Sequence, residues 1–89
     1  MNRPQVHAFA PARAPAQALA AALGVETREI ALHGFPDGEV LPTVKSTGGT
    51  VILYASLDRP NDKLIAVLLT LDAFRRAGAP RVVLVAPYL

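Results

Sequence analysis

Two short runs of apolar, largely β-branched residues flank one long helical pattern, and this arrangement constrains the fold more than any other feature. The runs are residues 50–55 and residues 81–86. Neither alternates strongly between polar and apolar side chains, which is typical of strands buried on both faces of a parallel sheet. Residues 62–77 between them predict a helix that Gly78 and Pro80 end. The three segments predict a βαβ unit, and hence an α/β fold with an open, mostly parallel sheet flanked by helices.

The helix over residues 62–77 has apolar residues at helical spacing, and these predict the side that packs on the sheet. Asn61 is the predicted N-cap, with Ser56 and Asp58 as nearby alternatives. The polar cluster of residues 56–62 therefore has a capping explanation. It also follows a parallel strand, where ligand sites are built. The predicted core-facing residues are Leu64, Leu68, Leu71 and Phe74, widened by Ile65, Leu69 and Ala73.

The front of the chain predicts a strand, a loop and a helix. Residues 5–9 form a short extended run, and residues 10–14 form a loop. An Ala- and Leu-rich helix over residues 16–23 follows, with Pro15 in its first turn, where the missing N–H is tolerated. Gly24 is the predicted residue after its C-terminus.

An antiparallel flap is predicted next. Residues 27–32 alternate as a second strand, and residues 33–38 form a turn cluster. Residues 40–44 resume an extended pattern in which Pro42 indicates an edge strand. The flap would carry the segment Phe35-Pro36-Asp37-Gly38 at its tip.

Composition limits the function. The 89 residues are 52% hydrophobic and 18% charged, which is typical of one globular domain over residues 1–89. The net charge is +2, 6% of the residues are aromatic and Trp is absent. The chain therefore lacks the basic stripe, with interleaved aromatic residues, that is typical of nucleic-acid-binding proteins. No Cys is present, His7 and His33 lie in different predicted elements, and prolines interrupt the apolar N-terminal stretch. We therefore expect no metal site, no catalytic residue, no nucleic-acid partner and no membrane span.

The segment Phe35-Pro36-Asp37-Gly38-Glu39 has two readings. It could be a tight turn, with Pro and Gly meeting its backbone requirements. It could also be a nucleotide contact, since an aromatic face can stack on a base and carboxylates accept hydrogen bonds. Spacing alone leaves both readings open.

Three segments in order resemble the N-terminal domain of ribose-phosphate pyrophosphokinases, and they extend over residues 35–89. The first is Phe35-Pro36-Asp37-Gly38-Glu39-Val40, and the second is Pro60-Asn61-Asp62-Lys63-Leu64. The third runs from Leu71-Asp72-Ala73-Phe74-Arg75-Arg76-Ala77-Gly78 to Val85-Ala86-Pro87-Tyr88-Leu89. Ala55 and Ala66 depart from the family, where glutamine and glutamate are common, and they indicate a divergent branch.

The resemblance implies a phosphoribosyltransferase-like half and an activity. The family transfers pyrophosphate from ATP to ribose 5-phosphate with Mg²⁺, giving PRPP and AMP, and works in the cytoplasm as a homo-oligomer. Carried over to this chain, Phe35 would stack on adenine, while Asp37 and Glu39 would hold its polar edge. The family's Arg-Gln-Asp loop, metal-binding aspartates and PRPP loop have no counterpart here, so we expect no turnover by this chain alone.

Two other hypotheses remain open. The chain could be a non-catalytic regulatory or oligomerisation module related to the synthetase, or a plain α/β domain with a structural loop. The sequence stops at Leu89, directly after the predicted buried strand over residues 81–86, and would leave Val85 to Leu89 unpaired. We therefore expect truncation, or a partner that covers this end.

Overall fold

The structure is a computed structural model of the whole chain. It describes residues 3–34, 40–44, 49–56 and 60–87, with side chains described except at 32–34, 40–43 and 60–63. Four parallel strands form the main sheet in the order β2-β1-β5-β6. They are β1 (Gln5–Ala8), β2 (Glu26–Glu29), β5 (Thr50–Tyr54) and β6 (Arg81–Val85). A separate antiparallel hairpin consists of β3 (Ala31–Gly34) and β4 (Val40–Thr43).

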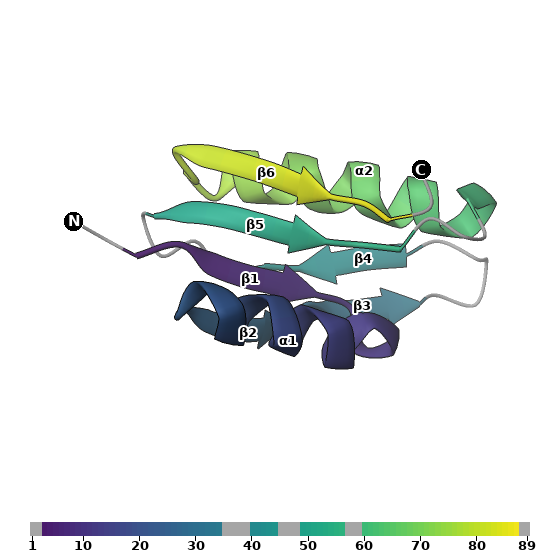
Figure 1. Cartoon of the computed structure of the whole chain (residues 1–89). Coiled ribbons are helices and arrows are strands. Elements are labelled where there is room, and N and C mark those ends of the chain that lie inside the picture. The colour runs from purple at the N-terminus through teal and green to yellow at the C-terminus, as the bar shows by residue number, and fades with distance from the viewer. Residues whose placement is uncertain (1–2, 35–39, 45–48, 57–59, 88–89) are drawn as a thin grey trace.

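Helices lie on both faces of the main sheet, as the α/β prediction requires. Figure 1 shows α1 (Arg13–Leu23) in front of β1 and β2, and α2 (Pro60–Arg76) behind β5 and β6. The β3–β4 hairpin lies on the same side of the sheet as α2. A short 3-10 helix, η1 (Ala10–Ala12), connects β1 to α1. The predicted open parallel sheet flanked by helices is confirmed.

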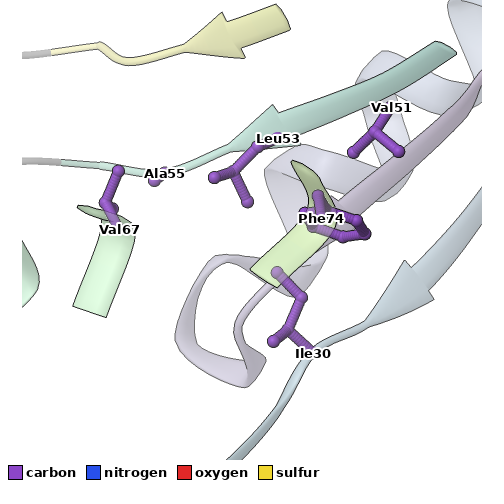
Figure 2. Close-up of a cluster of buried hydrophobic side chains, with 6 residues drawn as sticks. All are labelled: Ile30, Val51, Leu53, Ala55, Val67 and Phe74. Atoms are coloured by element: carbon purple, nitrogen blue, oxygen red, sulfur yellow. The ribbon is translucent and has the colours of Figure 1, made fainter. Parts of the chain in front are cut away.

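The larger part of the core lies between the main sheet and α2. Val51 and Leu53 of β5 are almost fully buried, as is Phe74 of α2. Ile52 and Tyr54 point to the opposite face, because side chains alternate along a strand, and they are only half-buried. Figure 2 shows the cluster on the α2 side, which consists of Ile30, Val51, Leu53, Ala55, Val67 and Phe74.

The core under α1 is smaller, because α1 contributes alanines. Val6 and Ala8 of β1 meet Ala16 and Ala20 of α1, and all four are buried. Alanine lets a helix approach a sheet closely and has the best helix propensity. Helix α1 begins at Arg13, two residues before Pro15, and ends at the left-handed Gly24 that the sequence predicts.

One predicted strand is two strands in the structure. The run over residues 27–32 is divided at Ile30, so that β2 joins the main sheet beside β1 while β3 joins the hairpin. The backbone N–H of Ile30 donates to the carbonyl of Ala8 at 2.8 Å, and its side chain is buried. The prediction of one flap strand was wrong, because alternation continues through this junction while the pairing partner changes.

The predicted core-facing side of the second helix was correct at Leu71 and Phe74, and wrong in the first half of the helix. Val67, Thr70 and Phe74 are the buried positions of α2, with Ala66 beside them. The Leu64–Leu68 row, which the sequence pattern assigned to the core, is exposed. A helix that is apolar on both sides gives periodicity no basis for choosing the inner one. None of the helices in the described part of the chain is long and apolar enough to span a membrane.

Candidate functional site

The four parallel strands end at one edge of the main sheet, and the chain changes direction there. From β1 the chain passes through α1 to β2 on one side, and later returns to β5 on the other side of β1. A ligand crevice in an open α/β sheet lies at such a switch point, outside the carboxyl ends of the strands. Phe9 and Ser56 follow β1 and β5 at this edge. The sheet topology therefore puts the candidate site between the ends of β1 and β5.

The β3–β4 hairpin extends past the same edge (Figure 1). It is attached to the sheet through Ile30, and its strands pair with Gly34 opposite Val40. The five residues between them include the predicted nucleotide contacts Phe35, Asp37 and Glu39, which lie outside the described residues. The structure thus positions the hairpin strands that carry the segment, and leaves the adenine-contact prediction untested.

A groove beside this edge joins the start of α1 to the end of β2. It has a volume of about 230 Å³, below the roughly 300–1,000 Å³ usual for small-molecule sites. The guanidinium of Arg13 donates to Glu29 Oε1 from Nη2 at 2.6 Å and from Nε at 3.2 Å. The lining residues are Ala8, Arg13, Gln17, Thr27, Arg28 and Glu29.

The charges in this groove are already paired. Arg13 forms an ion pair with Glu29, and Arg28 lies 3.5 Å from Glu26. Both pairs are largely exposed, so each is worth about 0–1 kcal/mol. Sequence patterns do not indicate this groove, because Arg13 and Glu29 are sixteen positions apart and only the α1–β2 crossover brings them together. Its geometry indicates a link between two elements, with no free charge left for a ligand.

His7 lies in the core of the protein. Its side chain is buried in β1, and the rings of His7 and Phe74 meet edge-to-face. Burial, followed by the positive charge of Arg28, lowers the pKa of His7 from 6.5 to about 4. Its Nε2, like Oε1 of Gln5, has no hydrogen-bond partner among the described residues. His7 is therefore neutral near pH 7.

Metal ligation finds no support in the described part of the chain. No group of three or more His, Asp or Glu side chains converges there. Of the predicted polar cluster at residues 56–62, only Ser56 has a described side chain, and it is half-buried at the end of β5.

Comparison with known proteins shows the family. The N-terminal domain of ribose phosphate pyrophosphokinase matches residues 6–89. A ribose-phosphate pyrophosphokinase of Methanopyrus kandleri is 37% identical over 73 residues, covering 80% of this chain and 25% of the relative. One of Granulibacter bethesdensis is 40% identical over 76 residues, covering 82% of this chain and 24% of the relative. The chain thus spans about a quarter of the length of these relatives.

The fold has a counterpart among solved structures. The crystal structure of a purine phosphoribosyltransferase from Pyrococcus horikoshii superposes with a TM-score of 0.67 at 12% sequence identity. The match covers 93% of this chain and 58% of the other, and at this identity it shows a shared fold alone. The profile match over nearly the whole length and the sequence relatives make this chain a member of the ribose-phosphate pyrophosphokinase family, corresponding to its N-terminal domain.

Proposed function

We propose that this chain acts as the N-terminal part of a ribose-phosphate diphosphokinase, which transfers pyrophosphate from ATP to ribose 5-phosphate. The products are PRPP and AMP. The observation that carries the proposal is the family match over residues 6–89. The switch-point edge of the sheet, with a hairpin extending past it, supports the same reading, because open α/β sheets bind ligands there.

The contribution proposed for this chain is an adenine contact. Phe35 would stack on the base, and Asp37 and Glu39 would accept hydrogen bonds from its amino edge. The supporting geometry is the pairing of Gly34 with Val40, which restricts the connection to residues 35–39 at one end of the hairpin.

The transfer step itself needs charge stabilisation that the described residues do not provide. Pyrophosphoryl transfer depends on metal ions and cationic groups around the phosphates. Mg²⁺, when bound, would neutralise phosphate charge, and its ligands would have to come from groups other than the described residues of this chain. We therefore expect no PRPP formation from the purified 89-residue chain.

Nucleotide titration followed by NMR tests the adenine contact. ATP at millimolar concentration should shift the amide signals of the hairpin, and Phe35→Ala should abolish those shifts. Leu23→Ala, an exposed apolar change on α1, serves as the matched control and should leave them intact. Absence of shifts in the native chain, or unchanged shifts in Phe35→Ala, would overturn the adenine contact, and PRPP formation would overturn the expected inactivity.

A further inference from the structure

The β3–β4 hairpin and the main sheet are two separate sheets in the described part of the chain. Strands β3 and β4 pair with each other, and within the described residues neither has a ladder of hydrogen bonds to the strands of the main sheet. A two-stranded hairpin alone is marginally stable in water. The direction in which the hairpin extends from the sheet must therefore be set by contacts at its base.

Ile30 forms the base of the hairpin on the β3 side, between the end of β2 at Glu29 and the start of β3 at Ala31. Its N–H donates to the carbonyl of Ala8 at 2.8 Å, which ties the backbone to the end of β1. Its side chain is 3% exposed and belongs to the same buried cluster as Phe74 (Figure 2). A β-branched side chain has little freedom at χ1, so a buried Ile30 also restricts the backbone that carries it.

Val44 forms the base of the hairpin on the β4 side. It follows directly on β4, which ends at Thr43, and its half-buried side chain packs against the same cluster as Ile30. Strand β4 also lies against α2. Both strands of the hairpin thus meet one apolar cluster, which holds the hairpin at two points. Two attachment points fix the direction of a ribbon, whereas one would leave it free to rotate.

We propose that Ile30 is a positioning residue for the adenine contact, with Val44 as a second and weaker anchor. The buried side chain of Ile30 fixes the angle between the hairpin and the main sheet, and thereby the place at which residues 35–39 meet a nucleotide. This inference rests on the function proposed above, because it gives Ile30 a part in that contact. Ile30 does not touch the nucleotide itself, since its side chain is buried in the core.

The length of the hairpin makes its far end sensitive to this angle. Gly34, at the end of β3, is four residues from Ile30, which corresponds to about 13 Å along an extended strand. A tilt of about 20° at the base would move the end of β3 by roughly 4–5 Å over that length. Atoms in van der Waals contact are about 3.5–4.0 Å apart, so a displacement of this size breaks a stacking contact.

The contact between β4 and α2 is the alternative source of the orientation. If it sufficed, truncating Ile30 would destabilise the core without changing the direction of the hairpin. Ile30→Ala separates the two, since it removes the side chain and keeps the N–H that donates to Ala8. Leu53→Ala is the matched control, because it removes the same number of carbon atoms from the same cluster, but from β5 in the main sheet.

Residual dipolar couplings of the backbone amides measure the orientation of the hairpin directly. In the native chain, the couplings from β3 and β4 should fit the alignment tensor of the main sheet. They should deviate from it in Ile30→Ala, deviate less in Val44→Ala and fit it in Leu53→Ala, and the conservative change Ile30→Val should keep the native fit. Native couplings that do not fit one tensor would overturn the proposal even where a variant failed to fold, and so would an unchanged fit in Ile30→Ala.

ATP titration of the same variants, followed by NMR, connects orientation to binding. Ile30→Ala should weaken ATP binding roughly tenfold, as when the binding-competent orientation falls to about a tenth of the molecules. Folded Leu53→Ala should keep the native affinity, and Ile30→Val should stay close to it.

Two outcomes of the titration separate the positioning role from the adenine contact. Equal ATP affinity in the native chain and in Ile30→Ala would overturn the positioning role and leave the adenine contact standing. No ATP-induced shift in the native chain would instead overturn the adenine contact, and with it the part of Ile30 in binding. The dipolar couplings would still decide whether Ile30 orients the hairpin.

Discussion

The ring of His7 on β1 lies edge-to-face against the ring of Phe74 on α2, with centroids 4.7 Å apart and planes at 70°. A protonated imidazole would be poorly accommodated there, because the surroundings are buried and Arg28 adds positive charge. The His7–Phe74 pair thus connects β1, at the centre of the sheet, to α2. Protonation of His7 would disturb this contact.

We predict that this contact makes the fold less stable in mild acid. The pKa of His7 is 6.5 in the unfolded chain and about 4 in the folded one, so between these values only the unfolded state takes up the proton. Stability is retained above pH 6.5, falls as the pH drops, and levels off near pH 4, by about 3 kcal/mol in all.

Urea unfolding at pH 7 and pH 5 measures this effect. In His7→Leu the contribution of this group disappears, so the loss of stability between the two pH values should be smaller than in the native chain. The quantity to compare is the loss of stability between pH 7 and pH 5 in the native chain and in His7→Leu. Both proteins contain His33, so its contribution cancels in the comparison. Identical pH dependence in both proteins would show that the pKa of His7 is not lowered by folding.

The glycine that ends α1 should resist substitution for a conformational reason. Gly24 has a φ of +70°, and a Cβ at this position would meet no atom closer than Arg3 Nη2 at 4.0 Å. Space is therefore available, and the cost of Gly24→Ala is the left-handed backbone, about 1–2 kcal/mol. Gly24→Asn should cost less, because Asn tolerates this conformation. Thermal unfolding of the native chain and the two variants should give the order of stability native, Gly24→Asn, Gly24→Ala. A purely steric effect would make Gly24→Asn the least stable, because Asn is larger than Ala.

The ion pair between Arg13 and Glu29 should contribute little to stability. Its atoms are 2.6 Å apart, but the side chains are 60% and 46% exposed. We predict a coupling energy below about 1 kcal/mol from a double-mutant cycle with Arg13→Ala and Glu29→Ala, decreasing further at high salt. The Asp72–Arg76 pair within α2 provides a matched exposed control. A coupling energy several times larger would mean that the groove is a rigid part of the fold.

Sequence patterns predicted the β5–α2–β6 unit of the main sheet well, because buried parallel strands are apolar on both faces and can be recognised without knowing which strands they pair with. The runs at β5 and β6 and the helix between them fall within one or two residues of their predicted bounds. Gly24 was also identified, since its requirement is local.

The failures have one cause in common, which is dependence on tertiary contacts. Alternation through residues 27–32 could not show that pairing changes at Ile30, and apolar residues all around α2 could not show which side the sheet would cover. The groove at Arg13 and Glu29 forms only when the crossover brings its two sides together. His7 is buried because β1 is a central strand of the sheet. A single polar residue in a sequence does not indicate such a position.

Ile30 connects the hairpin to the sheet and is itself part of the core. The hairpin therefore cannot swing as a free flap, because moving it would withdraw Ile30 from the cluster and break its hydrogen bond to Ala8. Exposing one such side chain costs about 1.5–3 kcal/mol, so a displaced hairpin would be present in fewer than about one molecule in ten. A ligand that binds to the hairpin would therefore contact an element that is anchored in the protein interior through Ile30.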